Sequence, residues 1–278
     1  MKRSKLQLLS LSLIVMLLFS CARQEMKPAE KTVVGIFTPY FYFPETLNGH
    51  VQMFREVNYW AQKENGGIIA GKRISLADRD SLIQWTNDIE VHFDENGNVK
   101  QSVFLDENDH SFGHWSVEST NGKVSKASWI SKDTVRNYVL ISHPSETELK
   151  MERFHGQTDT LINYAVVTLN QLGQKTAMQW YNSREQPRGY VRFNYNMAGQ
   201  LDNYTASNSD TLQVQMNFVT NDHGFFQSQE VYSARDNTTE VYVYEYTYDD
   251  KGNWISYTGY KDGIAQVVCN RTYTYYSE

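Results

Sequence analysis

The sequence predicts an all-β protein: a single antiparallel meander of about 15–17 strands, curled into a barrel or a nearly closed barrel. A two-sheet sandwich is the alternative architecture. Three observations predict this fold: turns that recur at regular spacing, alternation of polar and apolar residues between them, and a high tyrosine content. Aromatic residues make up 14% of the chain and tyrosine contributes 19 residues, which favours strands because tyrosine is a strand former.

The turns are marked by glycines that follow an Asn or Asp within three residues. Successive glycines are 25, 51, 26, 25 and 28 residues apart. The double gap is filled by the turn sequence Pro144-Ser145-Glu146-Thr147. Asn, Asp and Gly tolerate the positive φ that hairpin turns need, so each period holds two strands and two turns. The glycines are Gly97, Gly122, Gly173, Gly199, Gly224 and Gly252.

The segments between the turns alternate as half-buried strands do. In 210–219 four apolar residues at even positions oppose Gln213, Gln215 and Asn217. A sheet of this size with one apolar face has to curl, because strand twist accumulates and the apolar face needs cover. A closed barrel of so many strands has an interior wider than its own side chains can fill.

The N-terminus predicts export. Three basic residues precede the apolar run Leu6–Phe19, which is shorter than the roughly 20 residues that a membrane-spanning helix needs. Residues 1–20 are therefore read as a secretory signal, with an uncleaved anchor helix as the alternative. Leu18-Phe19-Ser20-Cys21 resembles the lipobox of bacterial lipoproteins, which implies a diacylated Cys21 as the mature N-terminus.

Three further regions follow the signal. Residues 21–32 are polar and suit a flexible tether, so the chain should contact the membrane through its N-terminal lipid only. Residues 33–48 are an extended aromatic segment that could fill part of the barrel, and exposure of Phe37, Tyr40 and Phe43 would refute this. Residues 49–278 form the meander domain.

The segment Tyr246–Trp254 resembles the Tyr-Asp (YD) repeats of the Rhs family, and weaker copies occur at Phe93–Val99 and Tyr195–Leu201 within about residues 86–276. The chain also resembles Bacteroidetes-type outer-membrane lipoproteins with a porin-like β meander. That resemblance implies a barrel-like architecture and a lipid-anchored place in the cell envelope, on the periplasmic or surface face of the outer membrane. It implies no activity.

Charge and cysteine content limit the partners. Without residues 1–20 the chain has 26 − 3 = 23 basic and 32 acidic residues, a net charge of −9, which disfavours nucleic acid. With Cys21 acylated, Cys269 is the remaining thiol, so no intramolecular disulfide is expected. We expect a monomer without a cofactor.

Catalytic motifs are weak. Residues 66–73 fit the start of a phosphate-binding loop but lack the following Ser or Thr, and turns explain their glycines. His110 and His114 have metal-pair spacing only on a helix. Residues 106–109 lack a full calcium-loop pattern, and Cys269 is read as a packed side chain. No metal site is predicted, and the chain is read as non-catalytic, with an unrecognised hydrolase left open.

Aromatic excess near the C-terminus is the remaining candidate. Four tyrosines alternate along one strand and four more follow, forming either a tyrosine-lined wall or a platform for sugars or peptides. The leading hypothesis is thus an envelope module that binds a glycan, peptide or protein; a carrier or sensor of an apolar ligand inside the barrel is the alternative. The candidates are Tyr242, Tyr244, Tyr246, Tyr248, Tyr257, Tyr260, Tyr273 and Tyr275.

Overall fold

The computed structural model describes residues 31–34, 45–78, 88–208 and 211–277, and every regular element in them is a β-strand, as the sequence predicts. The predicted signal, Cys21 and the aromatic residues Phe37, Tyr40 and Phe43 lie outside these residues. The strands are β1 (Lys31–Val34), β2 (Glu45–Asn48), β3 (Val51–Glu64), β4 (Gly67–Arg73), β5 (Asp88–Phe93), β6 (Val99–Leu105), β7 (Ser111–Thr120), β8 (Lys123–Ser131), β9 (Thr134–Ser145), β10 (Glu148–His155), β11 (Leu161–Leu169), β12 (Lys175–Asn182), β13 (Pro187–Tyr195), β14 (Leu201–Asn208), β15 (Thr211–Thr220), β16 (Phe226–Ser233), β17 (Thr238–Tyr248), β18 (Trp254–Lys261) and β19 (Ile264–Tyr275).

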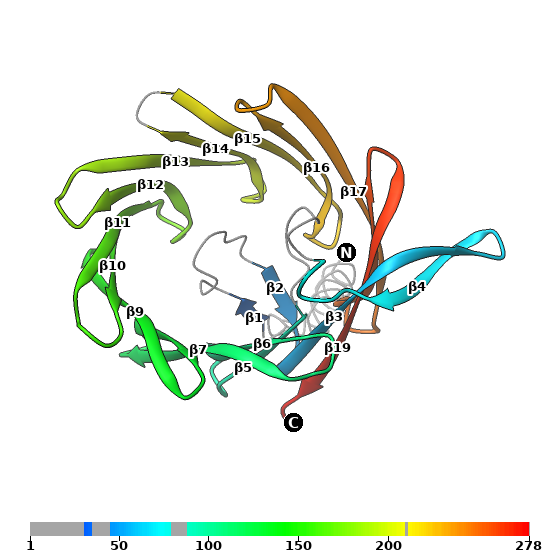
Figure 1. Ribbon diagram of the computed structural model, residues 1–278, viewed down its shortest axis with the longest axis horizontal. Coiled ribbons are helices and arrows are strands. Elements are labelled where there is room, and N and C mark those ends of the chain that lie inside the picture. Colours follow the sequence, from blue (N-terminus) through cyan, green and yellow to red (C-terminus); the bar gives the residue numbers. More distant parts are fainter. Residues whose placement is uncertain (1–30, 35–44, 79–87, 209–210, 278) are drawn as a thin grey trace, which may run out of the picture.

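Strands β3–β19 form one antiparallel sheet that closes on itself (Figure 1). The seam is the pairing of β19 with β3, from Val267 opposite Trp60 to Tyr275 opposite Val51. β4 pairs with β3 alone, while β5 also pairs with β3, so β4 is a branch and the ring itself has 17 − 1 = 16 strands. The predicted barrel is confirmed, and the sandwich alternative is not the fold. In the described part of the chain, no helix is long and apolar enough to span a membrane.

The β3–β4 hairpin projects from the ring at the right of Figure 1. It carries the glycines that suggested a phosphate-binding loop. Gly66 has a φ of 84° in the hairpin turn. Gly71 lies within β4, where a Cβ atom would sit 2.9 Å from the carbonyl oxygen of Trp60. A turn explains the first glycine, as predicted, but a close backbone approach rather than a second turn explains Gly71.

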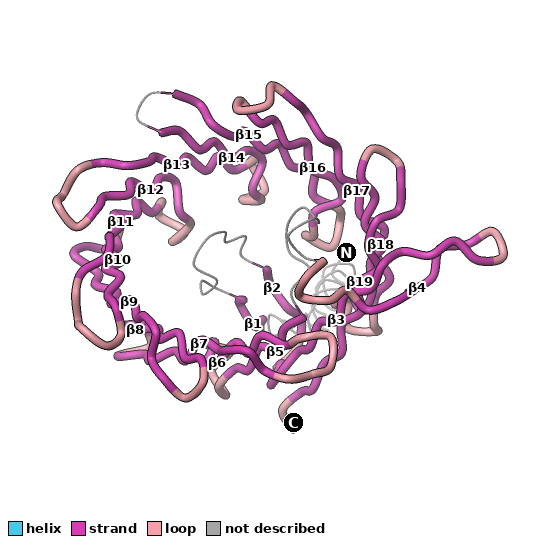
Figure 2. The backbone as a smooth tube through the Cα atoms, viewed as in Figure 1, coloured by secondary structure: helices cyan, strands magenta, loops and turns pink. Residues whose placement is uncertain are grey.

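The periodic turns lie at one end of the barrel, which we call the glycine rim, because alternate connections of a meander share an end. In Figure 2 the loops after β11, β13 and β15 lie inside the ring, whereas those after β12 and β16 lie outside it. The barrel therefore tapers toward the glycine rim. Its described turns are 94–98, 121–122, 146–147, 170–174, 196–200, 221–225 and 249–253.

Five of these turns share one local chemistry. In the turn after β5, Asp94 Oδ1 accepts hydrogen bonds from the backbone N–H groups of Asn96 (2.9 Å) and Asn98 (2.8 Å), and Gly97 has a φ of 78°. An Asx side chain at the first position thus holds the turn while a glycine supplies the positive φ. The same two bonds recur in the turns that begin at Asn170, Asn196, Asn221 and Asp249.

The apolar face of the sheet points into the ring. β2 lies inside the ring outline in Figure 1, and its fully buried Leu47 packs against Phe54, Val91 and Phe93 of the wall. Cross-strand pairing carries this face around the sheet, from Phe54 to Val91 and onward through Ser102, Trp115 and Trp129. The main core cluster, from Phe104 to Phe218, continues it over β6–β15. Neighbouring side chains on this concave face converge and exclude water from one another.

The outer face is mostly polar. Asn203 donates to Asn217 at 2.6 Å, Asn217 donates to Glu230 at 3.3 Å, and these residues alternate with the inward ones. Stacked aromatic pairs interrupt it near the rim opposite the glycine rim. Tyr164 and Tyr181 stack at 4.7 Å, and the ammonium group of Lys150 lies 5.0 Å from the Tyr164 ring. This surface suits contact with water.

Candidate functional site

The predicted tyrosine cluster does assemble, with one exception. Pairing of β17 with β18 sets Tyr246 opposite Tyr257, and pairing of β18 with β19 sets Tyr257 opposite Cys269. Tyr260 is opposite Val243, so it lies on the outer face, where its hydroxyl donates to Glu245 at 2.8 Å. The residues that share the inner face are Tyr242, Tyr244, Tyr246, Tyr248, Tyr257, Tyr273 and Tyr275.

The hydroxyl groups of this cluster bond to the protein itself. Tyr246 donates to the carbonyl of Phe226 at 2.8 Å, and Tyr244 accepts a bond from Gln229 Nε2 at 2.7 Å. Tyr275 donates to Asp249 at 2.9 Å, and burial raises its pKa to about 12. Similar bonds engage Tyr242, Tyr248 and Tyr273. A platform for sugars needs free hydroxyls at its edge, so the geometry favours the wall interpretation of these residues. Their binding role stays a prediction.

Arg271 is buried within the same wall, beside the seam. Its guanidinium carbon lies 3.6 Å from the Trp254 ring centroid and 4.2 Å from that of Phe54. Its nitrogens donate to the carboxylate of Glu56 and to the Tyr273 hydroxyl at 3.1 Å. This cation is paired with a carboxylate and lies against two aromatic rings, which is a structural arrangement.

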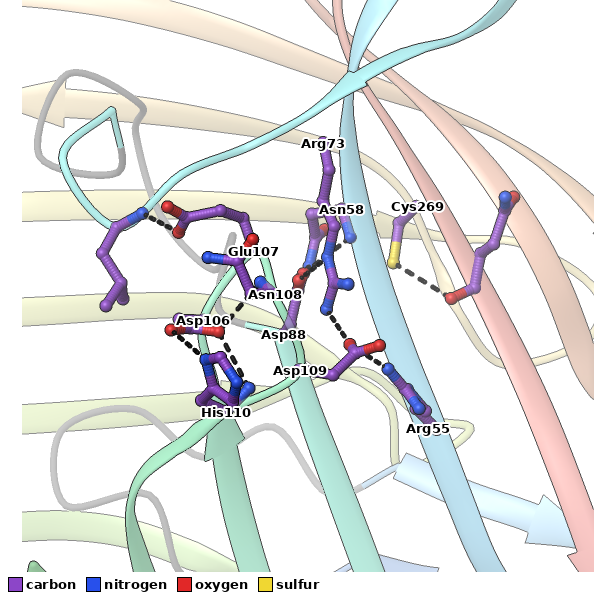
Figure 3. A network of polar contacts seen from close by, with 12 residues as sticks. Arg55, Asn58, Arg73, Asp88, Asp106, Glu107, Asn108, Asp109, His110 and Cys269 are labelled. Carbon is purple, nitrogen blue, oxygen red and sulfur yellow. Dashed lines mark hydrogen bonds and ion pairs between the residues drawn. The ribbon is translucent and has the colours of Figure 1, made fainter.

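A second polar network ties the β6–β7 turn to the fork where β4 and β5 both leave β3 (Figure 3). Arg73 pairs with the fully buried Asp88 at 2.6 Å and with Asp109 at 2.6 Å. Asp109 also pairs with Arg55. The hydrogen bond from Arg73, followed by the positive charge of Arg55, lowers the pKa of Asp109. The network holds strands and turn together.

The predicted turn at 106–109 is confirmed. Asp106 accepts backbone bonds from Asn108 and His110, each 2.8 Å long, and the bond from His110 is the main cause of its lowered pKa. His110 is in this turn and His114 is in β7. Among the described residues no three His, Cys, Asp or Glu side chains are grouped as metal ligands. Cys269 is fully buried, and burial raises the pKa of its thiol.

The apolar inner face changes character toward the end opposite the glycine rim. Arg153 of β10 is paired across the strands with Val139 and Asn163, and Asn137 is the next inward residue of β9. The amide oxygens of Asn137 and Asn163 are shielded from water and have no hydrogen-bond partner among the described residues. We call Asn137, Arg153 and Asn163 the mouth cluster.

Two half-buried tryptophans flank the mouth cluster on the same face. Trp129 is paired with Asn137, and Trp180 is paired with Ala165, the next inward residue after Asn163. The motif-based reading missed this site because no motif marks it. The available signal was position: Arg153 and Asn163 occupy the apolar phase of their strands, where an alternating pattern predicts inward residues.

The comparisons with known proteins bear on the fold. No protein family and no curated protein matches the sequence. Among solved structures, the barrel is similar to a porin-like protein from Bacteroides uniformis, with a TM-score of 0.50 and 9% identity over 81% of this chain and 96% of that one. A porin-like protein from Bacteroides vulgatus is 8% identical over 83% of this chain and 100% of that one, with a TM-score of 0.37. A Photorhabdus luminescens Tc holotoxin pore aligns at a TM-score of 0.17 and 10% identity, over 78% of this chain and 14% of that one.

At such identities the similarity establishes the architecture alone. The chain is an antiparallel β-barrel of the kind seen in the Bacteroides uniformis porin-like protein. The Rhs resemblance stays an expectation.

Proposed function

We propose that this chain is a non-catalytic lipoprotein of the bacterial cell envelope that holds an apolar ligand against the inner face of its barrel. Cys21, on the lipobox-like sequence, would anchor it by lipid to the outer membrane. The aromatic segment 33–48 would share the interior. The sequence left open both a tyrosine platform and a carrier of an apolar ligand. We favour the carrier, because the tyrosine hydroxyls already have hydrogen-bond partners within the protein.

The observation that carries the proposal is the orientation of the two faces. On β6–β16 the outer face carries ion pairs and amides, such as Lys150–Glu152 and Asn203–Asn217, whereas the inner face is mainly apolar. The apolar partners that pack against this cluster include Trp180, Val214 and Val231 of the wall itself. Half-buried residues such as Val214 and Val231 leave apolar area available on a face that a 16-strand barrel cannot fill by itself.

Ligand binding can be tested with the chain 21–278 carrying Cys21→Ser, which retains every described strand. N-phenyl-1-naphthylamine, an uncharged apolar dye, should bind saturably with increased fluorescence. Trp180→Ala on the inner face should weaken binding, whereas Tyr181→Ala, the next residue and outward-facing, should not. Equal effects of the two substitutions, or no saturable binding by the parent chain, would refute the proposal.

Anchoring is tested separately in cells. An alkyne analogue of palmitate should label the full-length protein, and Cys21→Ser should abolish both labelling and membrane fractionation. Persistent labelling of this variant would show that the lipid is attached elsewhere or that the signal has been misread.

A protein partner remains the second candidate, and the β3–β4 hairpin favours it. The hairpin projects from the ring, β4 pairs only with β3 among the described strands, and Ile69 is 40% exposed. An unpaired, apolar strand edge is a template for strand addition. Ile69→Pro should remove envelope cross-links formed through this edge while leaving dye binding intact; unchanged cross-links would exclude the hairpin.

A further inference from the structure

The mouth cluster adds a positive charge to one end of the apolar wall. Arg153 and Asn163 are direct cross-strand neighbours, and Asn137 is diagonal to Arg153. Direct neighbours on one face have Cβ atoms about 4.5–5.5 Å apart and diagonal ones about 7–8 Å. One small group bound at the inner face can therefore contact all three side chains.

The charge that strands β9–β13 themselves place on the inner face is positive. Strands β9, β11, β12 and β13 contain no acidic residue. In β10, Glu148 and Glu152 alternate with the inward Leu149 and Met151, and Glu152 pairs with Lys150 on the outside at 2.8 Å. In the part of β9–β13 that the structure describes, the inner face thus carries cationic side chains and no carboxylate, a charge pattern complementary to an anion.

The donors fit a carboxylate. A guanidinium binds a carboxylate through two parallel hydrogen bonds. A side-chain amide that rotates about its last torsion presents its NH2 group in place of its oxygen, so Asn137 and Asn163 can donate as well. From Arg153 toward the glycine rim, the next inward residues of β10 are Met151 and Leu149, which are apolar. The distance along the strand from Arg153 to Leu149 is about 13 Å.

We propose that the mouth cluster binds the carboxylate of a long-chain fatty acid whose hydrocarbon chain lies along the apolar inner face. The inference rests on the proposed function and adds the headgroup site and the ligand class. One guanidinium and two neutral amides match a single negative charge. Trp129 and Trp180, on either side of the cluster, are amphipathic rings suited to the boundary between headgroup and chain.

The test compares cis-parinaric acid with its methyl ester, both fluorescent when bound, on the chain 21–278 carrying Cys21→Ser. The parent should bind the acid about tenfold or more tightly than the ester, as expected for charge-assisted bonds to a carboxylate. Arg153→Gln and the isosteric Asn163→Asp should each remove that preference by weakening acid binding far more than ester binding. Arg192→Gln, an outward arginine over the Tyr190 ring, is the control and should change neither.

Ester binding reports the fold of each variant, so a loss of acid binding alone is specific to the headgroup. Retention of the acid preference by both Arg153→Gln and Asn163→Asp overturns the headgroup site while the proposed apolar binding stands. Failure of the parent to bind either probe overturns the proposed function itself. Displacement of the acid by dioleoylphosphatidylglycerol vesicles but not by palmitate would overturn the fatty acid in favour of a phospholipid.

Discussion

Removal of Glu56 should unfold the barrel at its seam more readily than removal of any surface carboxylate. Glu56 of β3 faces Arg271 of β19, and these two strands close the ring. The Arg271 side chain is 3% exposed and that of Glu56 is 16% exposed. Glu56→Ala leaves a buried guanidinium, close to the rings of Phe54 and Trp254, without its carboxylate.

The expected cost follows from this burial. Removing one partner of a buried ion pair costs about 3–5 kcal/mol, because the remaining charge is desolvated without compensation. The remaining bond to the Tyr273 hydroxyl offsets part of this, so we expect about 3 kcal/mol. Removing both partners, as Glu56→Ala with Arg271→Met, should cost less than Glu56→Ala alone, since no charge is then left buried.

Urea unfolding followed by tryptophan fluorescence measures these differences. The matched control is Glu152→Ala, which breaks the partly exposed pair with Lys150 on the outer face and should cost less than about 1 kcal/mol. The reasoning is wrong if Glu56→Ala is no more destabilising than Glu152→Ala. It is also wrong if the double variant is less stable than Glu56→Ala, because the uncompensated charge would not then be the cause.

Three further outcomes are expected. Burial lowers the pKa of Lys175 to about 7, so between about pH 7.5 and 9.5 the unfolded chain binds one more proton than the native chain, and the free energy of unfolding should rise by about 1.4 kcal/mol per pH unit. Lys175→Met should abolish this slope in urea titrations across that range; an unchanged slope would assign it to other groups. Asn196→Ala loses the two bonds from Ala198 and Gln200 and should cost about 1–2 kcal/mol in thermal unfolding, whereas Met197→Ala in the same turn, fully exposed, should cost nothing measurable. Cys269 should resist a thiol reagent at pH 8 until the chain carrying Cys21→Ser is unfolded, because a buried thiol with a raised pKa is inert; rapid native labelling would contradict its burial.

The sequence predicts the barrel well because turn chemistry is local. An Asx residue followed by a glycine at positive φ specifies a turn wherever it occurs, so the spacing of Gly97, Gly173 and Gly199 yields the strand lengths and their number. The turn predicted at Pro144–Thr147 has other residues; its first two residues end β9, and the turn itself, Glu146–Thr147, falls at the same rim. Closure follows from the accumulated twist of so many strands.

Alternation within a strand also predicts which residues share a face. Tyr257 and Tyr260 are three residues apart in β18, which by itself puts them on opposite faces, as the structure has them. Grouping Tyr260 with the cluster was therefore wrong for a reason that the sequence contains. The hydroxyl partners of the cluster, such as Phe226 and Gln229, lie on a neighbouring strand and depend on register, which spacing does not supply.

Register is also why the mouth cluster could not be assembled from the sequence. Alternation within each strand predicts that Arg153, Asn163 and Asn137 point inward. Whether they meet in one cluster depends on the exact register of β9, β10 and β11. The pairing of β10 with its neighbours shifts register between Glu148 and Lys150 and between Arg153 and Phe154. The lengths of the turns do not predict these shifts. A polar residue in the apolar phase of a strand is thus a local signal whose partners only the folded sheet identifies. In this barrel those partners lie at the end of an apolar wall, so the face that stabilises the fold is also the face on which we propose that a ligand binds.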